Sequence, residues 1–292
     1  MNHVCNICKN KKFSLISKKV RDSSNHKIIK CSICQHIQIS PIPSYEENRK
    51  FYDENKMSKN LKMNSINKIR QKFKFDTDLN VQLIQKIATK KDKILEIGSG
   101  YGFFLDEMEK KGYDITGVEL SKVRRNHSKK ITEAPVFDYD LTKTIPDFGK
   151  FNIILLFGVM EYIADPIQFL SNLREMIENK GKIVIISPNV NDLQLKLNEH
   201  YRNWFWQRAH INYFKKENLK FVLKKAKFKK IAISGIQRYS FENMIIWKLT
   251  HKPQLENPSH TVTNEYEFLD KYYKKILEQK LICDTLFAIA EK

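Results

Sequence analysis

Three closely spaced glycines and a carboxylate could bind a small ligand. An apolar run at residues 94–97 predicts a buried strand, glycines follow at 98, 100 and 102, and an amphipathic stretch then predicts a helix. A strand, a glycine turn and a helix bring backbone close to a ligand beside a helix N-terminus. The spacing is E-x-G-x-G-x-G, with Glu96 on the strand itself. An acid there suits a cationic ligand better than the diphosphate bound by G-x-G-x-x-G turns.

A second carboxylate, Glu119, ends the next apolar run at residues 115–118. A carboxylate at the end of a strand can accept hydrogen bonds from both hydroxyls of a ribose. The glycine motif alone could be only a tight turn. Together with Glu119, and with the alternating strands and helices that follow, it predicts a ligand site at one edge of a sheet.

Four cysteines form two C-x-x-C pairs, Cys5 with Cys8 and Cys31 with Cys34, and 22 residues separate the pairs. Two such pairs match a tetrahedral four-thiolate zinc site. The alternatives are two disulfides, which a cytoplasmic location disfavours, or unrelated buried thiols. Four thiolates leave no open coordination position, so the zinc would be structural, and we expect the nearby His36 to lie on the surface. The module is too short to bury a core of its own, so the metal would supply its folding energy.

The elements that must position these residues alternate along the chain. Helices are expected at 45–87, with Phe51 and Tyr52 in the first of them. A polar loop with two tryptophans is expected at 201–206. Gly181 is expected to turn a helix into the fifth strand. The predicted strands lie at 94–97, 115–118, 135–137, 151–157, 182–187, 231–236 and 282–290, and further helices at 103–110, 121–130, 165–177, 193–197 and 265–279.

Charge and composition restrict the partners. The formal net charge is +19, but only nine of the 52 basic residues are arginine, and the lysines are spread along the whole chain. Arginine is the residue suited to bidentate phosphate recognition, so the composition argues against a nucleic-acid partner. No apolar stretch of about 20 residues predicts a membrane span. The first residues do not resemble a secretory signal, and we expect a cytoplasmic protein.

Residues 93–119 resemble the first two motifs of class I S-adenosylmethionine-dependent methyltransferases. The resemblance implies that the glycine turn passes beneath the methionine part of the cofactor and that the acid after the second strand holds its ribose. An acid after the third strand accepts from the adenine amino group in this family; Asp140 fits best and Asp138 is the alternative. The cofactor-binding residues would then be Glu96, Gly98, Ser99, Gly100, Gly102, Glu119, Leu120, Asp140, Leu141 and Phe157.

Residues 158–166 resemble the family's fourth motif, but Gly158 and Tyr162 stand where histidines are usual. A histidine base is therefore absent here. Tyr162 could orient or polarise a substrate, or merely line the cleft, and with an ordinary pKa near 10 it is a poor base. Residues 209–214 resemble a Pro-His-x-x-Tyr-Phe segment of a methyltransferase group acting on sugars and surface glycans. His210 is the remaining base candidate, with a structural role as the alternative.

The likeness to this sugar and glycan group covers nearly the whole chain. A zinc ribbon, a Pro-rich exit and a tyrosine-bearing helix precede the catalytic domain in that group and cap its cleft. Aromatic rings in a loop over a cleft commonly stack on sugars, although core packing is an alternative for the two tryptophans. The resemblance implies substrate contacts from Trp204, Tyr213 and Asn243.

We therefore expect an α/β protein with a Rossmann-like, doubly wound class I methyltransferase sheet. A zinc ribbon would span residues 1–42, a helical linker or cap 43–92, and the methyltransferase domain 93–292. The expected reaction moves a methyl group from S-adenosylmethionine to an oxygen or nitrogen of a sugar, nucleotide-linked or part of a surface glycan, by a monomer or homodimer. Two rivals remain, an RNA or ribosomal-protein methyltransferase and a non-catalytic binding module with the same fold.

Overall fold

The computed structural model describes residues 4–44, 46–47, 66–147, 149–255 and 258–292. Its centre is a seven-stranded sheet in the order β10-β11-β8-β7-β4-β5-β6. All neighbouring strands are parallel except at β11, which runs antiparallel to both β8 and β10. The α/β fold with a mixed Rossmann-like sheet is thus confirmed. The strands are β4 (Lys93–Ile97), β5 (Asp114–Val118), β6 (Val136–Phe137), β7 (Phe151–Phe157), β8 (Ile177–Pro188), β10 (Lys229–Ile236) and β11 (Thr285–Glu291).

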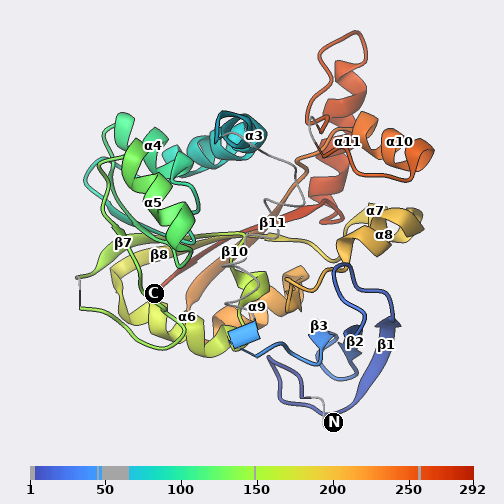
Figure 1. Ribbon diagram of the computed structural model, residues 1–292, viewed down its shortest axis with the longest axis horizontal. Coiled ribbons are helices and arrows are strands. Elements are labelled where there is room, and N and C mark those ends of the chain that lie inside the picture. Colours follow the sequence, from blue (N-terminus) through green and yellow to red (C-terminus); the bar gives the residue numbers. More distant parts are fainter. Residues whose placement is uncertain (1–3, 45, 48–65, 148, 256–257) are drawn as a thin grey trace.

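Helices cover both faces of this sheet (Figure 1). On one face lie α3 (Ile66–Gln85), α4 (Phe103–Lys110) and α5 (Lys122–Ile131), and on the other α6 (Pro166–Glu175) and α9 (Lys216–Lys225). The alternation of β7 explains why two layers can form. Ile153 and Leu155 belong to one apolar cluster, whereas Ile154 and Leu156 belong to the other. A strand that is buried on both faces is apolar along its whole length, and the nearly continuous apolar run at 151–157 fits this description.

Two local predictions were wrong. The fifth strand does not start after a turn at Gly181, because β8 already begins at Ile177 and its pairing with β7 shifts register between Phe151 and Ile153. Gly181 lies within this irregular strand, where an added Cβ would come 2.8 Å from the carbonyl oxygen of Asn152. The expected polar loop at 201–206 is mostly a helix, α8 (Glu199–Phe205), because the side chain of Asn198 accepts a hydrogen bond from the backbone of Tyr201.

The N-terminal module is a small antiparallel sheet that shares strands and core with the rest of the chain. Its strands β1 (Phe13–Ser17), β2 (Lys27–Cys31) and β3 (Ile37–Ser40) are extended by β9 (Asn212–Tyr213), which pairs with β3. Its apolar cluster is likewise shared between the two parts of the chain. The buried members are Val20, Ile28 and Ile39 from the module and Trp206, Ile211 and Tyr213 from beyond β8.

The remaining elements are helical. The helix α7 (Leu193–Leu197) follows β8 as predicted, and α11 (Glu267–Gln279) precedes β11. Residues 241–250, for which the sequence analysis makes no prediction, form α10 (Phe241–Thr250), capped by the side chain of Ser240. Phe51 and Tyr52 lie outside the described residues. Within the described part of the chain, no helix is both long and apolar enough to cross a membrane.

Candidate functional site

A cavity of about 420 Å³ opens at the carboxyl ends of β4, β7 and β8. β4 pairs with both β5 and β7, so the sheet order reverses at this strand, and ligands bind at such switch points in open α/β sheets. Residues of α3 form part of the wall, which accords with a capping role for this helix. The cavity is lined by polar, charged and aromatic side chains and by glycine backbone. The lining includes Asp76, Glu96, Ser99, Arg124, Phe157, Glu161, Tyr162 and Arg238, together with Gly98, Gly100 and Gly158.

The glycine turn between β4 and α4 lets backbone form the floor of the cavity. Gly98 has φ 75° and packs so closely that an added Cβ would lie 2.9 Å from Cγ2 of Val159. Gly100 has φ 58°, and no described atom lies within 4 Å of where its Cβ would be. Both residues therefore need the left-handed conformation. The space above Gly100 is open to a ligand.

Glu119 is held by backbone amides at the end of β5. Its Oε2 accepts a hydrogen bond from the amide of Gly100 at 2.8 Å, and its Oε1 accepts from the amide of Ser121 at 2.7 Å. The side chain is only 6% exposed. Each carboxylate oxygen keeps a second lone pair, so a pre-oriented acceptor for two hydroxyl groups remains.

Three buried acceptors lie at the carboxyl edge of the sheet, two of them on residues that line the cavity, and they fit a ligand that presents hydrogen-bond donors. Oε2 of Glu96, Oγ of Ser99 and Oδ2 of Asp140 are buried and find no hydrogen-bond partner among the described residues. Leaving such atoms unpaired costs free energy. Burial, with a smaller contribution from the charge of Glu119, raises the pKa of Glu96 well above its ordinary value. A cationic ligand beside Glu96 would relieve that penalty.

We therefore predict that the Glu96→Gln variant is more stable than the wild type when no ligand is bound. A carboxyl group whose pKa is higher in the folded than in the unfolded state lowers the free energy of unfolding as pH rises from about 4.5 through the folded pKa. Glutamine removes this penalty, so its melting temperature should exceed that of the wild type near pH 8 and match it near pH 4. A wild type that gains stability over this pH interval relative to the variant would contradict the assignment.

The two candidate acids for an adenine amino group differ in how they are engaged. The carboxylate of Asp138 accepts from Arg125 at 2.7 Å. Asp140 accepts from the backbone and hydroxyl of Thr142 through Oδ1 and leaves Oδ2 open. The side chain of Leu120 is 49% exposed at the end of β5, whereas Leu141 is buried in the core. Oδ2 of Asp140 is therefore available as the acceptor for an adenine amino group, the role that the resemblance implies for this residue.

The motif-four segment forms a short 3-10 helix, η1 (Met160–Tyr162), at the cavity wall. Glu161 is 3% exposed, and its Oε2 lies 3.4 Å from the Oγ of Ser187, which donates to it. Burial raises the pKa of Glu161 to about 7. Sequence reasoning missed this residue because it considered only the histidine positions on either side of it. The sequence did contain a signal for Glu161, since this glutamate lies within the segment that resembles the fourth motif.

His210 lies behind the cavity wall and is not one of the lining residues. It is 6% exposed, and its ring meets the ring of Tyr162 edge to face, with centroids 5.1 Å apart. The amide nitrogen of Gln207 donates to its Nε2 at 2.9 Å. Burial, with a smaller effect of the charge on Arg21, lowers the pKa of His210 to about 3. The histidine is therefore neutral and supports Tyr162, which itself lines the cavity.

The three predicted substrate contacts lie outside the cavity lining. The ring of Trp204 lies under the guanidinium of Arg21, 3.8 Å from the ring centroid, and lines a separate surface groove. The hydroxyl of Tyr213 is bonded to the backbone of Gln207 in the core shared with the N-terminal module. Asn243 donates to Oε1 of Gln254 at 2.6 Å and so joins α10 to the segment that follows it.

A further pair of lining residues was not assigned from the sequence. Arg238 follows β10, and Asp76 lies on α3. The guanidinium of Arg238 contacts Asp76 at 3.4 Å and Asp284 at 3.1 Å. The ion pairs fix the guanidinium at the wall of the cavity and connect it to the helix that covers the site. Only their meeting in space identifies them, because they lie 162 positions apart.

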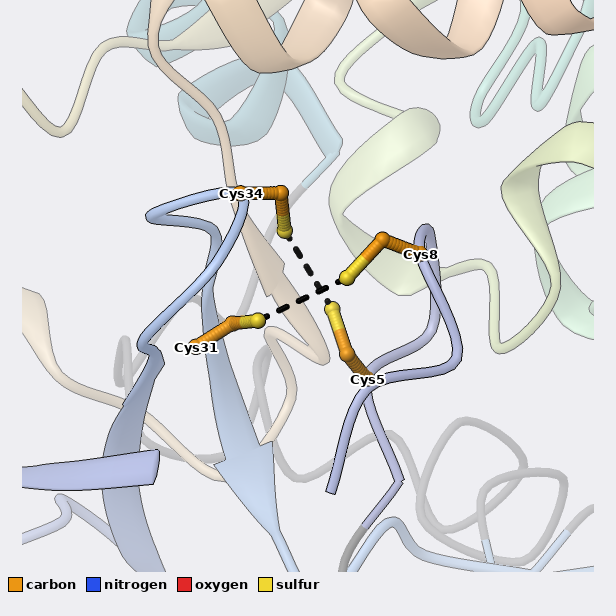
Figure 2. A group of neighbouring side chains, drawn as sticks. All are labelled: Cys5, Cys8, Cys31 and Cys34. Carbon is orange, nitrogen blue, oxygen red and sulfur yellow. Dashed lines mark hydrogen bonds between the residues drawn. The ribbon is translucent and has the colours of Figure 1, made fainter. Parts of the chain in front are cut away.

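Outside the cavity, the four N-terminal cysteines gather in one cluster (Figure 2). The sulfur atoms of Cys5, Cys8, Cys31 and Cys34 all lie within 4.8 Å of one another. The shortest pairs are 3.5 Å apart, far longer than a disulfide bond, and all four cysteines are free. Four thiolates around one tetrahedral metal ion would be about 3.8 Å apart, given metal–sulfur distances near 2.3 Å. The cluster could therefore hold a metal ion, and none of its four cysteines takes part in a disulfide.

Comparison with solved structures shows what fold this is. A methyltransferase of Thermotoga maritima, described as a possible histamine N-methyltransferase, superposes with a TM-score of 0.54 over 84% of this chain and 97% of that chain, at 14% identity. A phosphoethanolamine N-methyltransferase of Haemonchus contortus, solved with S-adenosylhomocysteine, gives a TM-score of 0.58 over 88% of this chain and 62% of that chain, at 20% identity. At these identities the likeness concerns the fold alone.

Comparison of sequences identifies the family. The ubiquinone biosynthesis O-methyltransferase of Coxiella burnetii is 27% identical over 133 residues, which are 43% of this chain and 52% of that protein. The chain thus spans about half the length of the curated relatives it matches. A family model described as a methyltransferase domain matches residues 69–233, more than half of the chain and the part that carries the cavity. The chain belongs to the methyltransferase domain family.

Proposed function

We propose that this protein transfers a methyl group from S-adenosylmethionine to a small acceptor molecule. The observation that carries the proposal is the set of acceptors at the carboxyl edge of the sheet: Glu96, which lines the cavity, Glu119 after β5 and Asp140 after β6. These groups match the donors of an amino acid ammonium, a ribose and an adenine. The structural relative solved with S-adenosylhomocysteine supports the same ligand class.

Each acceptor has a distinct task in this proposal. Glu96 faces the ammonium of the methionine part, Glu119 the two ribose hydroxyls, and Asp140 the adenine amino group. Ser99 and the backbone at Gly100 complete the floor, and Phe157 and Leu120 supply apolar contacts. When bound, S-adenosylmethionine supplies an electrophilic methyl group, whose bond to sulfur breaks as a bond to the acceptor atom forms.

The chain's own contribution to the reaction is alignment and removal of one proton. Glu161 lines the cavity, and with its pKa raised to about 7 it can take a proton from an acceptor hydroxyl near neutral pH. Tyr162, backed by His210, holds the acceptor against the methyl group. Arg238 and Asp76, which are paired with each other, offer a further donor and acceptor in the lining. This polar lining suits a sugar hydroxyl, and the curated relatives are named O-methyltransferases.

The proposal is tested first by cofactor binding. Glu119→Ala removes the charged partner of two hydroxyls and should weaken S-adenosylmethionine binding by roughly 2 kcal/mol or more, about 30-fold. Calorimetry measures this directly, with the exposed Glu133→Ala as a matched control that keeps wild-type affinity. Unchanged affinity in Glu119→Ala would show that the ribose lies elsewhere. Failure of the wild type to bind would refute the proposed function.

The acceptor is then sought with methyl-labelled cofactor and separate pools of nucleotide sugars, simple sugars and primary amines. Label in a sugar pool supports O-methylation or N-methylation of a sugar, and the labelled atom is located by mass spectrometry. Label only in the amine pool would replace the sugar with an amine acceptor, as in the structural relatives named N-methyltransferases.

We also propose a domain division and a structural metal. Residues 1–42 form a module in which Cys5, Cys8, Cys31 and Cys34 hold one zinc ion, and residues 43–92 are a linker or cap that includes the helix α3. The methyltransferase domain proper spans residues 93–292. The support is the clustering of all four sulfurs, which come from two C-x-x-C pairs that are separated in the sequence. No thiolate is left to open the coordination sphere, so the metal has a structural rather than a catalytic role.

A further inference from the structure

Asn212 lies where the N-terminal module meets the methyltransferase part of the chain. It belongs to β9, the short strand that pairs with β3 of the module, and its side chain is 1% exposed. Gln38 of β3 is its pairing partner. A buried amide must satisfy two donors and an acceptor oxygen, so the identity of its partners shows what it joins.

The amide of Asn212 makes hydrogen bonds on two opposite sides. Its Nδ2 donates to the carbonyl oxygen of Ile163 at 2.6 Å and to that of Met160 at 3.3 Å. Its Oδ1 accepts from Nδ2 of Asn6 at 2.9 Å and from Nε2 of His36 at 3.0 Å. Because carbonyl oxygens can only accept, the nitrogen must face residues 160–163, and this fixes the orientation of the amide.

The nitrogen side of Asn212 holds the segment that carries Glu161 and Tyr162. Met160 and Ile163 flank these two residues, so their carbonyl oxygens are tied at both ends of η1. The neighbouring amide of Ile211 donates to the backbone oxygen of Glu161 itself at 2.7 Å. Ile211 and Asn212 thus hold the backbone of residues 160–163, and the direction of the Glu161 carboxylate depends on that backbone.

The oxygen side of Asn212 holds the cysteine cluster. Asn6 lies inside the first C-x-x-C pair, and its backbone amide donates to Oε1 of Gln38 at 2.9 Å. His36 follows the second pair by two residues. The expectation that His36 lies on the surface is wrong, because its side chain is 0% exposed. One amide therefore contacts residues beside both halves of the cluster and residues on both sides of Glu161.

We propose that Asn212 is a positioning residue that couples the fold of the cysteine module to the placement of Glu161. This rests on the proposed function, in which Glu161 takes the acceptor proton. A substitution on the module side of Asn212 therefore alters the backbone position of η1, although no residue of the module is part of the described lining of the cavity. The module acts as a fixed support for the catalytic segment, and the amide is the joint between them.

A second buried amide provides a matched control. Nδ2 of Asn218 donates to the carbonyl oxygen of Cys34 at 2.8 Å, and Asn218 is 2% exposed. It joins the same module to α9, and no hydrogen bond connects it to η1 among the described residues. If any loss of support for the module disturbed the catalytic segment, Asn218→Ala would act like the variants at Asn212.

The test measures hydrogen exchange of the amides at 158–164 in metal-loaded protein, with metal content and S-adenosylmethionine affinity as controls. Asn212→Asp keeps the acceptor for Asn6 and His36 and replaces the donor to residues 160 and 163 by an acceptor. We expect exchange in this segment to rise about 10-fold, while cofactor affinity and bound metal stay at wild-type levels. On the acceptor found in the pool assay, kcat should fall about 10-fold with KM unchanged.

A double-mutant cycle separates coupling from local damage. Asn6→Ala should raise exchange at 158–164 about 3-fold, and should add nothing in the Asn212→Asp background. Asn218→Ala should leave the segment at its wild-type rate. Additive effects of the first two variants, or equal effects of Asn6→Ala and Asn218→Ala, would overturn the proposal. If Asn212→Asp loses its metal or unfolds, the comparison of Asn6→Ala with Asn218→Ala decides alone.

Discussion

Replacing Glu161 with glutamine is expected to lower methyl transfer to a hydroxyl acceptor by about 10²-fold or more. The amide keeps the size of the side chain but cannot take the proton, and removal of a general base commonly costs 10²–10⁴-fold. His210→Ala should cost far less, because the histidine lies behind Tyr162 and its lowered pKa makes it a weak proton acceptor. The measurement is kcat for both variants on the same acceptor, with cofactor affinity determined in parallel.

The pH dependence gives an independent check on Glu161. The base acts only when deprotonated, so kcat/KM of the wild type should rise as pH passes through about 7 and then level off. Glu161→Gln should lose this rise. Because the carboxyl pKa is raised by burial, the wild type also loses stability between about pH 4.5 and about pH 7, and the glutamine variant should be more stable above this interval by about 1–3 kcal/mol. A variant that is inactive because it is unstable would fail this second comparison.

Should His210→Ala be the more damaging change, the base is the histidine that the sequence alone suggested, and the cavity must rearrange when the acceptor binds. Should both variants keep wild-type rates, neither residue takes the proton. An amine acceptor is the simplest reason, since a neutral amine can attack with little help from a base.

Replacing Cys31 with serine is expected to give poorly folded protein rather than a folded, inactive enzyme. Metal analysis of the wild type purified without chelator should find about one zinc per chain, because four thiolates complete one tetrahedral site. Structural zinc contributes about 10–16 kcal/mol of folding free energy in small zinc modules, which is as large as the total stability of a typical domain, about 5–15 kcal/mol. The apolar cluster of the module includes Trp206, Ile211 and Tyr213, so unfolding of the module should also expose those residues.

Cys283→Ser is the control for this experiment. Cys283 is a buried thiol outside the cluster, so the variant should keep its metal and at most lose some stability. Circular dichroism and metal content distinguish the two cases. A Cys31→Ser variant, or a metal-free wild type, that stays fully folded would contradict a structural role for the cluster.

The cofactor end of the site could be predicted from the sequence because its geometry is local. Gly98 and Gly100 lie four residues or fewer from Glu96, and the turn that joins β4 to α4 needs the left-handed backbone at both glycines. Glu119 follows the neighbouring strand directly, and parallel pairing brings the ends of β4 and β5 to one edge. The two C-x-x-C pairs are equally local, and a hairpin suffices to bring them together.

The acceptor end depended on the tertiary structure. Arg238, Asp76 and Glu161 come from three distant segments, and neither their meeting nor the burial of Glu161 is encoded in any short pattern. Trp204 was predicted to lie over the cleft, but the cap at Asn198 turns its segment into a helix beside Arg21. Residue type and spacing determined which backbone is expected to bind the cofactor. Burial and long-range packing decided which carboxylate we propose as the base, because both depend on neighbours that are remote in sequence.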